Sequence, residues 1–337
     1  MDLFSLTRRL IDIESITDNE AAVGDFLHRH LSSIGYDARK LPVEGERANV
    51  FAVPRSVRHP RLVLSTHMDV VPPWFASSED EHNIYGRGAC DAKGIIAAQI
   101  AAAERLRKEG AAIGLLFLIG EERDSQGAKA ANEMARELHG SACKFLINGE
   151  PTDNRVATAS KGSLRVELVA RGKMAHSAYP ELGESAIEKL LAALDRVRKI
   201  SLPQDPEVGP CTVNIGIIEG GRAPNVIPDH ARAHLLYRLV GPSDDLKEKI
   251  TAAAGDLAEA HFILDIPFLK LHAPDGLPTM VAAFTTDIPA LTDWGGPVLV
   301  GPGSIHVAHT EREFVAKKEL QDAVELYVAI ARKLLSQ

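Results

Sequence analysis

The first half of the chain alternates short apolar runs with helical patterns, and this alternation limits the folds that it can adopt. Strand-like runs at 62–65, 113–119 and 144–147 are separated by helical stretches at 94–108 and 127–138. Strands that alternate with helices build a mostly parallel sheet covered by helices. In such sheets, ligands bind at the carboxyl ends of the strands, so the residues that follow each run are the first candidates for a functional site.

A different order of elements begins near residue 164. It predicts strand, helix, strand, strand, helix and strand, at 164–170, 185–200, 212–218, 231–239, 244–258 and 261–266. This is the order of a ferredoxin-like α+β unit. A later strand at 298–300 and an amphipathic helix at 317–335 return the chain to the first domain. We therefore predict one domain from 1–163 and 269–337, with a second domain inserted at 164–268.

Composition narrows the class of protein. Hydrophobic residues make up 45% and charged residues 25% of the chain, as in ordinary globular proteins. The net charge of −8, without a Lys/Arg cluster, argues against a nucleic-acid partner. The longest apolar run, 111–120, is too short to span a membrane. No secretion signal is recognisable and the three cysteines lie far apart, so we expect a cytoplasmic enzyme or binding protein.

Polar residues follow three of the predicted strands. His67 and Asp69 lie two positions apart after the first, and in an extended chain they point to the same side, so Asp69 could accept the second N–H of a metal-bound His67. Glu121 and Glu122 follow the most apolar run, and Glu150 follows the next. Without a cation, adjacent buried carboxylates repel one another. Polar or acidic surface turns are the alternative interpretation of these positions.

Two further segments carry candidate ligands. Asp91 lies in the glycine-rich stretch Y-G-R-G-A-C-D-A-K-G, which has neither the phosphate-loop nor the dinucleotide spacing; it could bind a metal or cap the following helix. His306 and His309 lie in G-P-G-S-I-H-V-A-H, and only one of them is needed. Together the set predicts a two-metal site formed by His67, Asp91, Glu121, Glu122, Glu150 and His309.

These motifs resemble one known family. S-T-H-M-D, G-R-G-A-C-D-A-K-G, G-E-E, G-E-P-T and G-P-G-S-I-x-x-A-H are similar to the cocatalytic-zinc metallopeptidases, which include acetylornithine deacetylase, succinyl-diaminopimelate desuccinylase, aminoacylase and glutamate carboxypeptidase. The resemblance covers nearly the whole chain. It implies a zinc-exopeptidase-like catalytic domain of α/β class and an inserted ferredoxin-like lid or dimerisation domain.

The resemblance also implies roles for the residues. Asp91 would bridge two metal ions, and the peptide bond that follows it would be cis. One ion would take His67 and Glu150, and the other Glu122 and His309. Glu121 would act as the general base and Asp69 as the partner of His67. His and carboxylate ligands suit two zinc ions and also accept cobalt or manganese.

Three positions in the inserted domain complete the implied site. His176 would reach the reaction from the partner subunit of a homodimer and stabilise the oxyanion. Asn225 and Arg238 would hold the carboxylate of a small N-acyl amino acid or dipeptide, because the arginine fork binds carboxylates with two hydrogen bonds. The alternatives are a histidine in a turn for His176 and a surface arginine for Arg238.

The function expected from the resemblance is metal-dependent hydrolysis of the amide bond of an N-acyl amino acid. The motifs G-P-G-S-I-x-x-A-H and Glu150-Pro-Thr, with Lys161-Gly162, are most similar to the acetylornithine deacetylase branch, which implies a role in arginine biosynthesis. Ser160 and Lys161 replace the arginines of the desuccinylase branch. A desuccinylase, a lysine-pathway deacetylase, or a dipeptidase or carboxypeptidase would use the same site. A non-catalytic binding protein is the alternative from another class.

Overall fold

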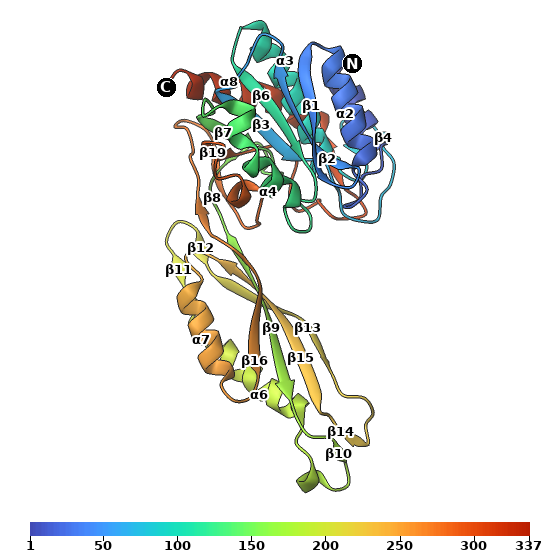
Figure 1. Cartoon of the computed structure of the whole chain (residues 1–337), viewed down its shortest axis with the longest axis vertical. Helices are drawn as coiled ribbons and strands as arrows, with labels where there is room; N and C mark the ends of the chain where they lie inside the picture. Colours follow the sequence, from blue (N-terminus) through green and yellow to red (C-terminus); the bar gives the residue numbers. More distant parts are fainter. The chain divides into compact units, whose positions relative to one another are not determined.

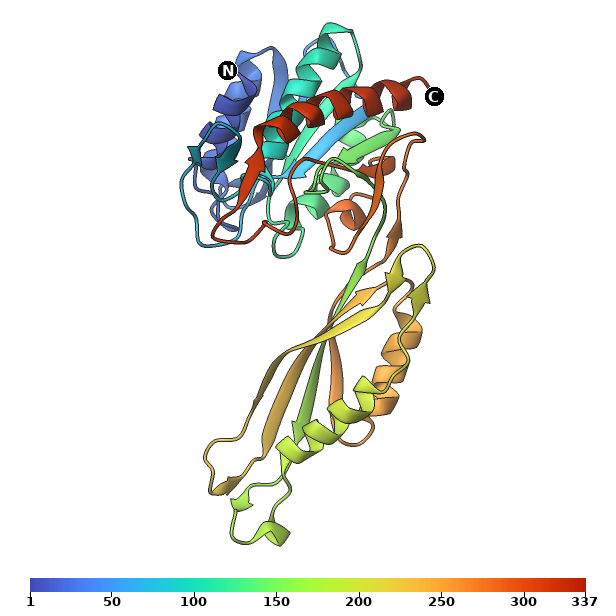
Figure 2. The ribbon, with the colours of Figure 1, turned by 180° about the vertical axis from the view of Figure 1, so that it is seen from behind.

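The computed structural model describes all 337 residues and divides them into two compact units. Unit 1 comprises Met1–Thr158, Leu271–Met280 and Thr286–Gln337, and unit 2 comprises Ala159–Lys270 and Val281–Thr285. The expected inserted domain, 164–268, lies within unit 2. The short return of the chain to unit 2 at 281–285 was not expected. Figure 1 and Figure 2 show the chain from opposite sides.

A long sheet forms the centre of unit 1. Its strands follow in the order β1 (Tyr36–Glu44), β2 (Arg47–Pro54), β6 (Ile113–Leu118), β3 (Leu62–His67), β7 (Phe145–Asn148), β19 (Gly296–Leu299) and β8 (Val156–Ser160). The four strands β6, β3, β7 and β19 pair in parallel, whereas the pairs on both sides are antiparallel. Two short strands, β17 (Leu269–Lys270) and β18 (Thr279–Ala282), pair with β8. The predicted α/β class is confirmed, and the antiparallel sides are an addition to it.

Helices cover both faces of this sheet (Figure 1). Every residue of β3 and β6 is buried, as expected for strands that are covered on both faces. Alternate residues of β3 face opposite cores: Leu64 packs in the larger core and Val63 in the smaller one. The larger core includes α1 (Leu3–Ile11), α2 (Ala21–Ser33), α3 (Lys93–Lys108) and α8 (Lys317–Leu335), and the smaller one includes α4 (Gln126–Glu133) and α5 (Ala135–His139).

The last helix, α8, fixes the chain that precedes it. Its buried stripe includes Leu320, Val324, Tyr327 and Leu334, at the spacing of an amphipathic helix. The hydroxyl group of Tyr327 donates a hydrogen bond of 2.9 Å to the carbonyl oxygen of Val300. Helix α8 therefore holds the end of β19, where the glycine-rich loop begins.

A small antiparallel sheet lies beside the glycine-rich stretch. It contains β4 (Ser78–Glu79), β5 (Asn83–Tyr85) and β20 (Phe314–Ala316). Since β20 pairs with β5, the chain just before α8 is held next to the chain that leads to Asp91. A 3₁₀ turn, η2 (Ile288–Ala290), follows the second crossing from unit 2 to unit 1.

Unit 2 is an antiparallel sheet with two helices. The strands follow in the order β13 (Thr212–Gly220), β15 (His230–Leu239), β9 (Gly162–Arg171) and β16 (Glu259–Ile266), and the helices are α6 (Ala186–Arg198) and α7 (Asp244–Ala254). Both helices pack against this sheet around one apolar core. The chain order and the sheet order are those of a ferredoxin-like unit. Minor elements are β10 (Ala175–His176), η1 (Pro180–Leu182), β11 (Gln204–Asp205), β12 (Gly209–Pro210) and β14 (Val226–Ile227).

None of the helices combines the length and the apolar composition that crossing a membrane requires. The cytoplasmic location stays a prediction.

Candidate metal centre

The candidate ligands come from the ends of the parallel strands of unit 1. His67 is the last residue of β3, Glu122 follows β6, and Glu150 follows β7 by two residues. His309 lies in the loop after β19, and Asp91 lies just before α3. Because the carboxyl ends of parallel strands meet at one edge of a sheet, segments that are distant in the sequence reach the same place.

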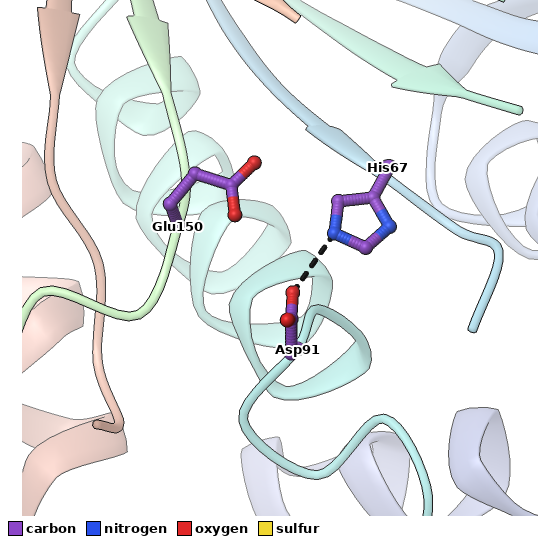
Figure 3. Close-up of side chains that lie close together, drawn as sticks. All are labelled: His67, Asp91 and Glu150. Atoms are coloured by element: carbon purple, nitrogen blue, oxygen red, sulfur yellow. Dashed lines mark hydrogen bonds and ion pairs between the residues drawn. The ribbon is translucent and has the colours of Figure 1, made fainter. Parts of the chain in front are cut away.

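The first group of potential ligands contains His67, Asp91 and Glu150. Their ligand atoms lie within 4.8 Å of one another, and all three residues are buried. His67 Nε2 lies 2.9 Å from Asp91 Oδ1. Figure 3 shows the three side chains converging from the end of β3, from the turn before α3 and from the chain after β7.

The second group contains Asp91, Glu122 and His309. His309 Nε2 lies 2.9 Å from Glu122 Oε1 and 3.3 Å from Asp91 Oδ2. Asp91 thus belongs to both groups and turns one carboxylate oxygen toward each. The backbone of His309 has a φ of +62°, in the left-handed region that residues other than glycine adopt infrequently. His306 is exposed and belongs to neither group.

Asp69 contacts His67 mainly through its backbone. His67 Nδ1 lies 3.0 Å from the carbonyl oxygen of Asp69 and 3.5 Å from its Oδ1. The Asp69 carboxylate instead accepts the backbone N–H groups of Glu121 and Glu122, each at 3.2 Å, and the hydroxyl group of Thr17 at 3.0 Å. Asp69 therefore fixes both the ring of His67 and the turn that carries the two glutamates.

The carboxylates of the site perturb one another. Burial and the nearby charge of Glu150 raise the pKa of Glu121, and burial raises that of Glu150. Burial also acts to raise the pKa of Asp91, but the hydrogen bonds from His309 and His67 outweigh it, so that this pKa is lowered. Hydrogen bonds to Asp91 and Glu122 raise the pKa of His309 to about 10. The site therefore concentrates negative charge that only a cation or a proton can balance.

The residues fit divalent cations. Glu150 Oε1 is buried and has no hydrogen-bond partner. A buried carboxylate oxygen without a partner is costly, and a cation at this position would remove that cost. Imidazole nitrogens with carboxylate oxygens are the ligand set of zinc, cobalt and manganese sites. The geometry and the chemistry therefore agree with a site for two cations that share Asp91. The Asp91–Ala92 peptide bond is cis, as the resemblance implies.

Asp287 was not among the site residues predicted from the sequence. It precedes η2, it is 1% exposed, and neither of its carboxylate oxygens has a hydrogen-bond partner. Burial raises the pKa of Asp287 to about 7. Its negative charge in turn raises the pKa of Glu121. Asp287 follows no predicted strand, so no pattern in the sequence marked it.

The three remaining predicted residues lie in unit 2. His176 is exposed in β10, and its Nδ1 accepts the backbone N–H of Ala178 at 3.1 Å. The carbonyl oxygen of Asn225 accepts the backbone N–H of Ser177 at 3.1 Å, so the segments of His176 and Asn225 are neighbours. Arg238 is partly buried in β15, and burial lowers its pKa. It pairs with Thr212, whereas Asn225 adjoins Val226 beyond the opposite end of β15, so one subunit does not bring Asn225 and Arg238 together.

Comparison with known proteins decides the family. Residues 158–262 match the model of the M20 peptidase dimerisation domain. A probable carboxypeptidase of Aspergillus fumigatus is 37% identical to the chain over 384 aligned positions, which cover 99% of this chain and 87% of that protein. The chain belongs to the M20 peptidase family. As an M20 peptidase it is a hydrolase of amide bonds, and it carries the dimerisation domain of the family.

Solved structures agree in fold with this M20 peptidase. A tripeptidase of Staphylococcus aureus has a TM-score of 0.82 at 21% identity, and the match covers 98% of each chain. A dinuclear metal-binding M20 peptidase of Bacillus subtilis has a TM-score of 0.71 at 17% identity, covering 99% of this chain and 98% of that one. At these identities the likeness concerns the fold. None of these proteins is named as an acetylornithine deacetylase, so the comparisons do not assign the chain to that branch of the family.

Proposed function

We propose that this M20 peptidase uses two divalent cations to hydrolyse the amide bond of a small N-acyl amino acid or short peptide that carries a free carboxylate. The observation that carries the proposal is the position of Asp91, whose two carboxylate oxygens face two separate groups of potential ligands. A carboxylate in this position can bridge two cations.

The proposed ligands divide between two ions. His67 and Glu150 would bind the first ion, Glu122 and His309 the second, and Asp91 both. The dinuclear relative from Bacillus subtilis, which shares the fold, supports two ions. Zinc is our first choice, with cobalt or manganese as substitutes. A pair of such cations would supply acidified water and polarise the amide carbonyl.

Glu121 is the proposed general base. Desolvation of its carboxylate raises its pKa, which makes it a stronger proton acceptor than an exposed glutamate. Its side chain takes part in none of the hydrogen bonds of the structure, whereas its backbone is fixed by Asp69. Glu121 would accept the proton of the attacking water and deliver it to the leaving amine.

The residues that we propose to bind the substrate lie in unit 2. Arg238, whose lowered pKa reflects a guanidinium group that is already partly desolvated, would hold the substrate carboxylate. Asn225 lies beside the segment of His176, beyond the other end of β15, and would reach the same carboxylate from the second subunit. His176 would stabilise the oxyanion from the second subunit of a homodimer; its exposed position and the match to a dimerisation domain support this role.

The proposal includes two classes of substrate. The name of the Aspergillus relative, a probable carboxypeptidase, favours a peptide substrate. The motifs around Glu150 and His309 favour deacetylation of N-acetylornithine. Both reactions cleave an amide bond next to an amino acid with a free carboxylate, so the same ligands and the same base serve either one.

A metal and substrate screen tests the proposal. The metal-free protein would be loaded with zinc or cobalt, its bound metal counted, and amine release measured with N-acetylornithine, N-succinyl-diaminopimelate and a series of dipeptides. We expect two equivalents of metal and hydrolysis of at least one substrate class. Amides with a blocked carboxylate are the matched control and should be cleaved poorly. Full metal loading without hydrolysis of any member would contradict the proposed function.

A further inference from the structure

A buried carboxylate outside the two ligand groups holds the backbone that leads to Asp91. Glu313 is fully buried directly before β20. Its Oε1 accepts three backbone N–H groups, those of Gly88 at 2.9 Å, Cys90 at 3.2 Å and Asp91 at 3.2 Å. One oxygen atom of a residue 222 positions away thus fixes the backbone amide of the proposed bridging ligand itself.

Arg87 neutralises this carboxylate. Its guanidinium group is 1% exposed and donates from Nη1 to Glu313 Oε2 at 2.7 Å. The Nε atom of Arg87 donates to the carbonyl oxygen of Pro73 at 3.1 Å, and the guanidinium group lies 5.1 Å from the ring centroid of Phe75. A buried ion pair contributes little net stability, because desolvation offsets the attraction between its charges. The contribution of this ion pair therefore lies in the position in which it holds the Glu313 carboxylate.

The loop around Glu313 has the geometry of an anion cradle. Gly88 has a φ of +89°, and a Cβ atom at this position would come within 2.9 Å of side-chain atoms of both Lys93 and Val70. Only glycine suits this turn, which directs the N–H groups of Gly88, Cys90 and Asp91 inward, while that of Ala89 donates to the carbonyl oxygen of Gly86. Such concave runs of backbone amides bind anions, and here the anion is a side chain of the same chain.

The segment that supplies Glu313 also supplies His309. Near its start, Gly303 packs so closely on the loop that a Cβ atom there would lie 2.5 Å from the Cβ of Cys90. His309, between these two contacts, lies 3.3 Å from Asp91 Oδ2. The segment 303–313 thus contacts the Asp91 loop at both of its ends and contributes a candidate ligand from its middle.

We propose that Glu313 is a positioning residue for the metal centre: by accepting the backbone N–H groups of Gly88, Cys90 and Asp91, it holds the Asp91 carboxylate where it faces both ligand groups. The inference rests on the proposed role of Asp91 as the bridging ligand. Because a bridging ligand serves both ions, loss of the Glu313 contacts weakens binding of both cations. Loss of a ligand that serves one ion, such as His309, weakens one.

A pair of double variants isolates the hydrogen bonds from the charges. R87M/E313Q removes both buried charges, and the amide oxygen of glutamine can still accept the three N–H groups. R87M/E313L removes the same charges and replaces the acceptor by methyl groups, on a side chain that is one bond shorter. Because both charges are removed in each protein, neither variant leaves an unbalanced buried charge. The two proteins differ mainly in whether the side chain at position 313 has a hydrogen-bond acceptor.

The first readout is the affinity for zinc and cobalt, measured by calorimetry and by the visible absorption of bound cobalt. Loss of groups that orient metal ligands typically weakens metal binding by about 10-fold to 100-fold. We expect R87M/E313L to bind both cations at least ~10-fold more weakly than R87M/E313Q, with an altered cobalt spectrum. H309A is the comparison in which one cation is affected. Equal affinities and spectra in the two double variants would overturn the inference.

Amide hydrogen exchange on the metal-free protein keeps the test decisive if R87M/E313L does not fold. The amides of Gly88, Cys90 and Asp91 should be protected in the wild type and in R87M/E313Q. Exchange in the metal-free wild type as fast as in an exposed turn would overturn the inference. If instead the wild type bound fewer than two cations while these amides stayed protected, the proposed function would fail and the positioning contact would stand.

Discussion

Asp69 Oδ1 accepts the backbone N–H of Glu121 at 3.2 Å, although the two residues lie 52 positions apart. The other oxygen of Asp69 accepts the backbone N–H of Glu122 at the same distance. The turn that carries the proposed base is therefore fixed through its main chain. A change in the side chain of Glu121 should leave the neighbouring proposed ligand, Glu122, in place.

The variant E121Q follows from this relationship. It should retain both cations, because no proposed ligand is removed, and its turnover should fall by about 10²-fold to 10⁴-fold, the usual contribution of a general base. Metal analysis and amine release on the same preparation measure the two effects. The variant E122Q is the matched control and should lose metal. Near-normal turnover of E121Q at full metal occupancy would remove Glu121 from its role.

The variant H309A should lose one of two metal equivalents, because His309 contacts only the second group of ligands. Equilibrium dialysis with metal analysis would count the bound ions. H306A, at an exposed histidine of the same loop, is the control and should keep both. Two tightly bound equivalents in H309A would show that the second ion does not depend on this ring.

The raised pKa of Asp287 predicts that the folding stability of the metal-free protein depends on pH. Its pKa in the folded chain is about 7, raised from an ordinary value of 3.8, mainly by burial. Between these pH values the unfolded chain releases the proton and the folded chain keeps it. The contribution to stability is thus fully present below about pH 4 and is lost as the pH rises through about 7.

The variant D287N cannot ionise at this position and should lose less stability than the wild type between pH 5 and pH 8. Thermal unfolding of both metal-free proteins at the two pH values tests the difference. D275N, at an exposed aspartate, serves as the control and should follow the wild type. Identical pH dependence of D287N and the wild type would contradict the assignment.

Subunit complementation tests His176. H176A and E121Q should each be inactive as homodimers. If His176 acts on the site of the partner, a heterodimer of the two variants contains one site with both an intact Glu121 and an intact His176 from the other subunit. We expect activity equivalent to about one site per dimer. Heterodimers purified through two different tags and still inactive would contradict action between subunits.

The sequence predicted those candidate ligands that directly follow the parallel strands of the sheet. His67, Glu122 and Glu150 each follow an apolar run, and the rule that parallel strands end at one edge was enough to bring them together. His309 could not be chosen over His306 from spacing alone, because the choice depends on a left-handed turn of the glycine-rich loop.

Other features depend on contacts that no local pattern reveals. Asp287 reaches the site from a segment that follows a second crossing between the units. Glu313 and Arg87 form a pair across 226 positions, and each alone has the pattern of an ordinary surface charge. The alternation rule placed Asp69 on the same side as His67, but the chain leaves the strand at that point, so the backbone carbonyl is the nearer partner of the ring.

The order of the ligands along the chain has a consequence for synthesis. His67, Asp91, Glu122 and Glu150 all precede unit 2, whereas His309 follows it. A ribosome therefore completes all of unit 2 before it adds the last proposed ligand. A polypeptide that ends before His309 would hold only the first group of proposed ligands, so we expect hydrolytic activity only near the end of translation.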